Sequence, residues 1–369
     1  MKKVYRILAS LLLLMLVISA RPAAAAPRIN AVFGGSVLES MNTGMSVLWN
    51  PALSAYNADP MVSVSIIGTD GFLSLQQQIN NISNAKIPDL QTDEVAFYPS
   101  TAGYFIGYSG KWFALTVSSF VESEIHYNLS SATTVTLTGS YLFSDVPVIG
   151  NLAIGSNLHL FGGSKIHCTY DKSSGIITTD TIDGNGVSLD LGIISELSDQ
   201  FHFGVTVRDV IYGFWGDRTY RMMSLGGTVF AEENKEYVFD RFDRDSEMIF
   251  AGGALQPDWE YGFPARTTLD LGVAFLPTER TKIMVDMKGL RFGRDERDWP
   301  NSVFASLGLK IEQTFSPVTC SLGVIIYTGN DFVFNAGAVY QGDKTRIRLA
   351  LGFEEYGNFL FNVGMGWSY

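Results

Sequence analysis

The chain ends in Asn362-Val363-Gly364-Met365-Gly366-Trp367-Ser368-Tyr369, and this stretch decides the fold class. Its side chains alternate with the period of two that is typical of a β-strand. The apolar face carries Phe359, Phe361, Val363, Met365, Trp367 and Tyr369, and the other face carries Asn362, Gly364, Gly366 and Ser368. A strand with one apolar face and an aromatic end indicates the closing strand of a transmembrane β-barrel in a bacterial outer membrane.

The same alternation recurs along the whole chain. Lumenal and lipid-facing residues alternate along each strand of such a barrel, with turn residues between strands. The pattern is found at 61–67, 102–109, 111–121, 133–143, 151–163, 187–193, 201–208, 268–275, 282–287, 303–311, 315–327, 330–340, 344–353 and 357–369. The sequence therefore predicts an all-β fold, an antiparallel transmembrane barrel of about 14 strands, with 12 or 16 strands as alternatives.

The lengths of the connections fix an orientation. With the C-terminus in the periplasm, the four longest connections, 68–101, 164–186, 209–264 and 288–301, all lie outside the cell. Short periplasmic turns and long outer loops are the rule for outer-membrane barrels. We expect a long extracellular loop at 209–264, rich in aromatic residues, within which an extra hairpin could lie. Helical spacing of apolar residues at 72–82 indicates a short amphipathic helix.

The N-terminus predicts the compartment. Basic residues precede an apolar run, Ile7–Ala20, and Ala24-Ala25-Ala26 supplies small residues for cleavage. The run is about 14 residues long, whereas a membrane-spanning helix needs roughly 20. We therefore interpret residues 1–26 as a secretory signal peptide, residues 27–59 as a separate N-terminal segment and residues 60–369 as the barrel.

Composition excludes several classes of protein. Removal of residues 1–26 takes away four of the 26 basic residues, so 22 basic and 37 acidic residues remain, a net charge of −15. This balance argues against a nucleic-acid partner. Cys168 and Cys320 are too few for a disulfide framework, and the four histidines have no metal-ligand spacing. We expect no metal site and no cofactor.

Residues 27–59 are Gly-rich and contain Asn50-Pro51-Ala52-Leu53 shortly before the first strand. Pro51 fixes its own φ and disfavours a helical conformation at Asn50, whose side chain can bond to nearby backbone. The motif predicts a rigid corner in a segment that leaves the lumen and enters the wall. A 14-stranded wall encloses a lumen wide enough to need a plug, and residues 27–59 are numerous enough to form one.

This arrangement resembles the FadL-type outer-membrane transporters of hydrophobic compounds, together with the related PorV-like and TraF-like barrel proteins. The resemblance rests on Asn50, Pro51, Ala52 and Leu53, and on Gly34, Gly35 and Gly44 upstream. It implies that residues 27–59 form a lumenal hatch, with residues 50–53 in it and on the ligand path. It also implies passive transport of small, fatty-acid-like hydrophobic molecules across the outer membrane. The PorV-like and TraF-like relatives imply an alternative: a non-transporting partner in secretion or in envelope and surface assembly, with 209–264 as its docking surface.

The C-terminal residues Asn362, Gly364, Trp367 and Tyr369 resemble the signal read by the outer-membrane barrel assembly machinery. That machinery, membrane lipid and a small hydrophobic ligand are therefore the expected partners. A barrel enzyme would need a nucleophile and a base on neighbouring strands, and His202 near Ser188 and Asp190 is the candidate set. A chance polar cluster is the favoured interpretation, so we predict that the protein is not an enzyme. A secreted β-sandwich is the alternative fold.

Glycines recur on the polar face of the strands, among them Gly192, Gly204, Gly272, Gly308, Gly323, Gly337, Gly352 and Gly364. Glycine within a strand often marks close approach of another backbone. Two interpretations stay open: curvature of the barrel wall, or a segment packed inside the lumen against these positions.

Overall fold

Fifteen strands form one antiparallel sheet in the computed structural model, which describes residues 38, 45–57, 59–69, 100–124, 128–147, 149–171, 174–224, 228–240, 267–291, 306–327, 332–354 and 359–368. Two short 3₁₀ helices, η1 (Ser46–Leu48) and η2 (Pro51–Tyr56), precede the strands. The strands are β1 (Met61–Thr69), β2 (Ser100–Ser109), β3 (Phe113–Glu124), β4 (Asn128–Val146), β5 (Gly150–Asp171), β6 (Ile176–Ser198), β7 (Phe201–Ser224), β8 (Val229–Asp240), β9 (Thr268–Thr278), β10 (Thr281–Arg291), β11 (Ser306–Phe315), β12 (Val318–Tyr327), β13 (Phe332–Gln341), β14 (Thr345–Glu354) and β15 (Phe359–Ser368).

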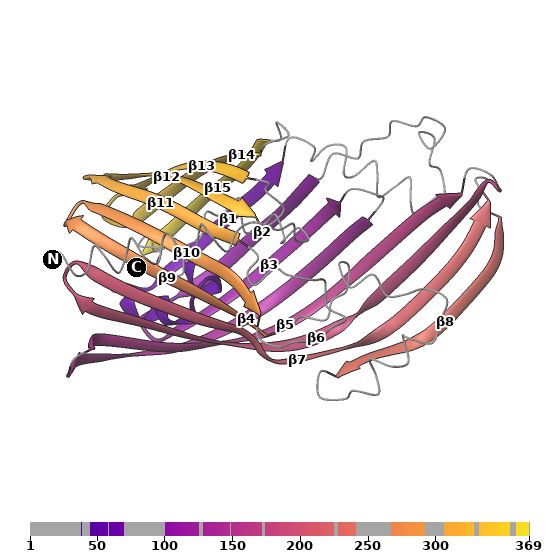
Figure 1. The fold of residues 1–369 in the computed structure, drawn as a ribbon, viewed down its shortest axis with the longest axis horizontal. Helices are drawn as coiled ribbons and strands as arrows, with labels where there is room; N and C mark the ends of the chain where they lie inside the picture. Colours follow the sequence, from indigo (N-terminus) through magenta and orange to yellow (C-terminus); the bar gives the residue numbers. More distant parts are fainter. Residues whose placement is uncertain are drawn as a thin grey trace.

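Fourteen of these strands close into a barrel (Figure 1). The closing strand β15 pairs with both β1 and β14, and the lower part of β7 pairs with β6 and β9. The fifteenth strand, β8, pairs with the upper part of β7 alone among the described strands. The predicted barrel of about 14 strands is therefore confirmed, and each of the predicted strands overlaps one strand of the wall.

The outer surface is an apolar band bounded by aromatic residues, as in outer-membrane barrels. Aliphatic side chains such as Ile193, Leu322 and Val363 are exposed around the middle of the wall. Near the short turns, the exposed aromatic residues are Tyr108, Trp112, Phe113, Tyr141, Phe143, Phe315, Tyr340 and Trp367. Along β15 the exposed residues alternate with buried Asn362, Gly364 and Gly366, as the sequence predicted. The chain is thus an outer-membrane type of barrel with its apolar face toward lipid.

Six short turns lie at one end of the barrel, where the sequence predicted the periplasmic side. They fall at 110–112, 147–149, 199–200, 279–280, 316–317 and 342–344. The turn predicted around Gln313 is displaced to Ser316-Pro317, because β11 continues to Phe315. The helix predicted at 72–82 and the signal peptide at 1–26 lie outside the described residues. Among the described residues, no helix has the length and hydropathy required to cross a membrane.

Two predicted loops are wrong in part. In the connection expected at 164–186, β5 continues to Asp171 and β6 begins at Ile176, so Cys168 lies in a strand opposite Thr179. In the expected loop 209–264, residues 209–224 continue β7 and 229–240 form β8. These strands extend beyond the apolar band, where both faces of a sheet meet polar surroundings, so the period-two apolar signal is lost.

The extended parts of β5, β6, β7 and β8 form a curved sheet that projects beyond the rest of the wall (Figure 1). On its inner face Phe161 stacks with Tyr212 and Phe214, at ring-centroid distances of 5.7 and 6.3 Å. Arg218 donates from Nε and Nη2 to both carboxylate oxygens of Asp180. Two-point pairing and aromatic packing therefore hold this extension together.

The lipid-facing assignment can be tested by charge insertion. We expect Leu322→Arg, in the middle of the apolar band, to lower the free energy of unfolding by about 2–4 kcal/mol, because a cation is costly at the membrane midplane. Urea unfolding in lipid vesicles measures it. Val229→Arg is the control, an exposed apolar residue beyond the band at the start of β8, and should change stability little. Equal effects at the two positions would contradict the assignment.

Candidate functional site

The N-terminal segment 45–57 lies on the inner face of the barrel wall. Helix η2 packs against β3, β4, β5 and β6. Its neighbours are inward-facing residues, because Ile154 and Ile193, whose side chains point the other way, are exposed on the lipid side. Within the segment Val47, Asn50 and Ala52 have no exposed surface. The predicted corner therefore sits in the lumen in close contact with the wall.

Asn50 attaches this corner to two strands. Its side-chain oxygen accepts from the backbone N–H of Ala52 at 2.9 Å and caps η2, and Pro51 takes the first helical position, which suits its fixed φ. Its Nδ2 donates to the carbonyl of Ile193 at 3.1 Å and to that of Val205 at 3.3 Å. Ile193 and Val205 face each other across β6 and β7. One amide thus caps the helix and bridges two strands of the wall.

Two glycines allow this close approach. A Cβ on Gly192 would lie 2.1 Å from Asn50 Oδ1, and a Cβ on Gly155 would lie 2.5 Å from the carbonyl carbon of Pro51. Both distances are far below van der Waals contact, so no larger residue fits while the corner stays in place. At Gly192 the N-terminal segment packs against the bare position. The bare positions at Gly323, Gly337, Gly352 and Gly364 instead face neighbouring parts of the wall.

Arg208 on β7 binds the end of η1. Its Nη1 donates to the carbonyl of Leu48 at 3.1 Å and its Nη2 to that of Trp49 at 3.2 Å. The Thr206 hydroxyl donates to the same Trp49 carbonyl at 3.0 Å, and Asn157 Nδ2 donates to the carbonyl of Val47 at 2.8 Å. Wall side chains thereby satisfy backbone acceptors at the end of a short helix, where helical partners are missing.

The charge of Arg208 is balanced by two buried aspartates. Its Nε donates to Asp270 Oδ2 at 2.6 Å, and its Nη1 lies 3.6 Å from Asp190 Oδ2. The side chains of Asp190 and Asp270 are each only 3% exposed. Asp190 also accepts from His159 Nε2 at 3.0 Å, if that nitrogen carries the proton. Buried charges need such pairing, so Arg208 ties β5, β6, β7, β9 and η1 into one network.

The same aspartates stabilise two irregularities in the wall. The first is a bulge in β7. Opposite the stretch Leu189 to Leu191 of β6, β7 carries two extra residues, and Asp209 within this bulge adopts φ 51°. The N–H of Asp209 donates to Asp190 Oδ1 at 2.9 Å. At the bulge of β10, Gly289 has φ 69° and donates its N–H to Asp270 Oδ1 at 2.8 Å. Each carboxylate thus holds a bulge with one oxygen and faces Arg208 with the other.

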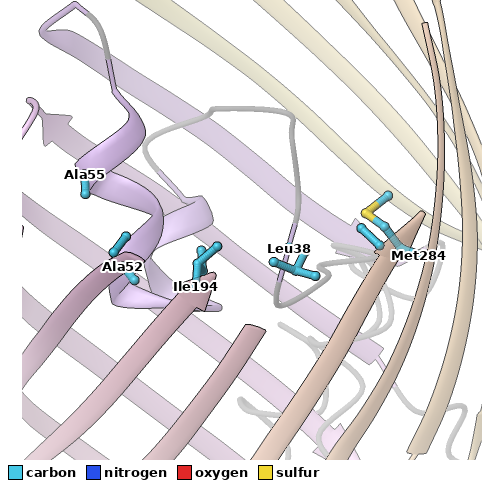
Figure 2. Close-up of a cluster of buried hydrophobic side chains, with 7 residues drawn as sticks. Leu38, Ala52, Ala55, Ile194 and Met284 are labelled. Carbon is cyan, nitrogen blue, oxygen red and sulfur yellow. The ribbon is translucent and has the colours of Figure 1, made fainter. Parts of the chain in front are cut away.

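Apolar contacts complete the attachment on the side of the turns. Leu38, Ala52, Ala55, Ala153, Ile194, Ala274 and Met284 form one buried cluster. Figure 2 shows Leu38 between Ile194 and Met284, and Ala52 and Ala55 on η2 nearby. Lys282 Nζ donates to the carbonyl of Leu38 at 2.5 Å. The N-terminal segment therefore contacts the wall at several separate places.

A second apolar cluster lies on the other side of the segment. Met45 and Trp49 pack there against Ile67, Phe105, Val333 and Leu360, which come from four strands of the wall. The ammonium of Lys288 lies 4.7 Å from the centre of the Trp49 ring, within reach of a cation–π interaction. The segment and the wall thus bury large apolar side chains against each other in this part of the lumen.

At the C-terminal end of η2, the Ser54 hydroxyl lies 2.6 Å from that of Ser140 on β4 and donates to the carbonyl of Pro51. The Tyr56 hydroxyl has no hydrogen-bond partner among the described residues. Burial, and secondarily the charge of Glu196, raise the pKa of Tyr56 well above its usual range. The phenol is therefore neutral at physiological pH.

The structure brings Asn50, Pro51 and Ala52 to the wall, with Leu53 packed at the edge of the Leu38 cluster. Trp367 is exposed on the outer face, Asn362 and Gly364 face inward, and Tyr369 lies outside the described residues, as do Gly34, Gly35 and Gly44. The role of these C-terminal residues as an assembly signal stays a prediction.

His202 is not the histidine beside Ser188 and Asp190. It pairs with Glu196 in the β6–β7 register, and His159 lies opposite Ser188 instead. His159 Nδ1 is 2.8 Å from the Thr136 hydroxyl, and Thr136 has no exposed surface. The cluster connects strands, and a substrate could not reach that hydroxyl. Among the described residues, no group of histidine, cysteine and carboxylate side chains is arranged to hold a metal ion.

Sequence reasoning did not single out Arg208, Asn157, Thr206 or Gly155 as site residues. Each belongs to a strand with ordinary alternation, and nothing in that pattern separates an inward residue that touches the N-terminal segment from one that lines the wall. Gly155 could have been found, since a glycine within a strand marks close approach of backbone.

These features define a class: a 14-stranded outer-membrane barrel whose N-terminal segment lies in its lumen. Solved structures of the same fold include hydrocarbon channels. The chain is similar to the CymD monoaromatic hydrocarbon channel, with 10% identity, a TM-score of 0.56, and coverage of 94% of this chain and 98% of that one. The chain is also similar to the Pseudomonas putida toluene transporter TodX, with 12% identity, a TM-score of 0.55, and coverage of 94% of this chain and 98% of that one.

A Pseudomonas aeruginosa FadL homologue matches with 10% identity and a TM-score of 0.55, over 94% of this chain and 99% of that one. At these identities the likeness establishes the fold, and the resemblance to FadL-type transporters noted from the sequence is confirmed at that level. No family model and no curated protein sequence matches the chain.

The close approach at Gly192 generates a stability prediction. Gly192→Ala should destabilise the protein by about 1–3 kcal/mol, because the new methyl group forces the Asn50 corner off the wall. Gly308→Ala is the matched control, since a Cβ there meets Asp286 at an ordinary 3.8 Å. Urea unfolding in vesicles and protease cleavage within residues 45–57 are the measurements. Unchanged stability and protection in Gly192→Ala would contradict the contact.

The Arg208 network predicts non-additive energetics. Arg208→Met should cost about 3 kcal/mol, because it leaves buried carboxylates without their cation. Adding Asp270→Asn should recover part of that loss, because the amide oxygen still accepts from Gly289 while one negative charge disappears. A double-mutant cycle measured by unfolding in vesicles tests this coupling, and strictly additive effects would rule it out.

Proposed function

We propose that this protein is a passive channel for small hydrophobic molecules across the outer membrane, with residues 45–57 as part of a hatch that plugs the lumen. The observation that carries the proposal is the attachment of the Asn50-Pro51-Ala52 corner to the inner wall beside an apolar lumenal cluster. The shared fold supports it, since CymD and TodX are a monoaromatic hydrocarbon channel and a toluene transporter.

The lining of the lumen fits this substrate class. A hydrophobic compound that enters past the aromatic stack of Phe161, Tyr212 and Phe214 would next meet the cluster around Trp49 and Phe105. Burial of apolar surface supplies its affinity, at about 25 cal/mol per Å². Onward passage then needs displacement of the segment that Asn50 and Arg208 hold.

The alternative, a partner in secretion or surface assembly, is not favoured by the comparisons, which return channels. Its expected docking surface at 209–264 includes the strand residues of β7 and β8, which extend the wall. The prediction that the protein is not an enzyme agrees with the channels among its structural neighbours, and is part of this proposal.

A reversible crosslink tests whether the segment must move. In a background with Cys168→Ser and Cys320→Ser, we expect oxidised Ser54→Cys/Ser140→Cys to lower uptake of toluene at least tenfold, with recovery on reduction. The hydroxyls are 2.6 Å apart, so the two thiols can pair. Uptake by cells or proteoliposomes that contain the purified barrel is the measurement.

Ser119→Cys/Thr133→Cys is the matched control, because its hydroxyls are 2.9 Å apart across β3 and β4, within the wall. Its oxidation should leave uptake unchanged. Uptake that persists with the Ser54–Ser140 crosslink closed would disprove the hatch, and an uncrosslinked protein that takes up no toluene would count against the channel for such compounds.

A further inference from the structure

Strand β8 leaves one edge of the projecting sheet without a partner among the described strands. It pairs with β7, from Gly213 opposite Asp240 to Met223 opposite Val229, and with no other described strand. Figure 1 shows β8 at the border of this sheet, beyond the rest of the wall. An unpaired edge presents backbone N–H and C=O groups that can pair with a further strand. We call it the far edge of β8, because it faces away from β7.

The described part of the chain leaves the side chains of β8 uncovered. Residues 229–236 are all exposed, and Val229 and Phe230 at the start of the strand are 49% and 61% exposed. The strand projects beyond the apolar band, so these residues meet water rather than lipid. A polypeptide segment from outside the described chain can therefore reach the far edge.

Three carboxylates form a row that ends at this edge. Asp183 on β6 pairs with Asp217 on β7, and Asp217 pairs with Glu236 on β8, so the three side chains share one face of the sheet. All three residues are exposed. Directly opposed residues of antiparallel strands have Cβ atoms about 5 Å apart, and like charges in such positions repel each other. The row therefore favours a cation beside Glu236.

Each arginine and lysine described in this part of β7 and β8 already has a carboxylate partner. The ion pairs are Arg218–Asp180, Arg221–Glu232 and Lys235–Glu233. The three carboxylates of the row, in contrast, have no ion-pair partner within the described residues. A fixed cation for the row must therefore come from outside the described chain.

The charge of β8 also decides which strand can pair with it. Over 229–236 the strand carries Glu232, Glu233 and Glu236 against Lys235 alone. A second copy of β8 at the far edge would bring two acidic strands together, which like-charge repulsion disfavours. A strand with lysine or arginine at alternate positions would place its cations on the face of the carboxylate row, since alternate side chains share one face. In such strand addition, backbone pairing gives affinity and side chains give specificity.

We propose that the far edge of β8 binds an extended, basic polypeptide segment of another protein, which adds a strand to the projecting sheet. The alternate lysine or arginine side chains of this segment lie beside Glu236 and Asp217. The barrel remains a channel in this proposal, which goes beyond the transport of hydrophobic molecules and does not depend on it.

Binding of a short peptide of alternating threonine and lysine tests the proposal. The peptide carries a fluorophore, and its fluorescence anisotropy is measured with the whole barrel in a non-ionic detergent at low ionic strength. We expect saturable binding, because threonine favours an extended strand and lysine supplies the cations. Asp217→Asn/Glu236→Gln should weaken this binding at least fivefold. A carbodiimide, which joins amines to carboxylates, should crosslink the peptide to Asp217 or Glu236, and mass spectrometry locates the bond.

Two controls separate strand addition from general attraction between charges. A peptide with the same number of lysines, separated by pairs of prolines, should bind at least fivefold more weakly, because proline lacks the N–H and favours a polyproline II conformation. Glu279→Gln/Asp343→Asn is the matched variant, since it removes two exposed carboxylates in turns at the other end of the barrel. This variant should bind the threonine–lysine peptide as the unmodified protein does.

Heat-modifiable migration on gels confirms that each variant is folded before binding is measured. The proposal is overturned if the threonine–lysine peptide does not bind, if the proline peptide binds as tightly, or if the two double variants lose affinity equally. Carbodiimide crosslinks between β8 strands of two copies, formed without peptide, would overturn it as well, because a second copy would then occupy the edge. None of these outcomes depends on toluene uptake.

Discussion

The ion pairs of Arg208 are the interaction on which the interior of this barrel depends. One guanidinium faces Asp190 and Asp270 and also donates to the carbonyls of Leu48 and Trp49. Charges in a buried site require partners, so the position of η1 and the two wall bulges are determined together. Displacement of the N-terminal segment would therefore change the surroundings of a charged network.

The inner wall divides into regions with different chemistry. Bare glycines at Gly155 and Gly192 receive the Asn50 corner, large apolar residues line the lumen beside Trp49, and the seam at β15 carries arginines and serines. A closed sheet makes this possible, because each inward residue of every strand meets the same enclosed space.

The alternation of apolar and polar side chains predicted the strands of the wall well where one face of the sheet meets lipid. Strands of the wall show it within the apolar band, and β15 shows it clearly, with Val363 exposed and Asn362 buried. It failed along the outer parts of β5 to β8, which extend beyond the apolar band. The Asn50-Pro51-Ala52 corner was predictable because proline and a capping side chain act locally.

The sequence by itself determined the barrel class, the approximate strand number, the orientation of the lipid face and the rigid corner before β1. These depend on local rules: period two, turn lengths and the conformational restrictions of proline. Only the tertiary structure decided what the corner touches and that Arg208 holds it, since Asn50 is 143 residues from Ile193. Such contacts depend on which strands close the ring and in what register, and that information is not contained in any one segment.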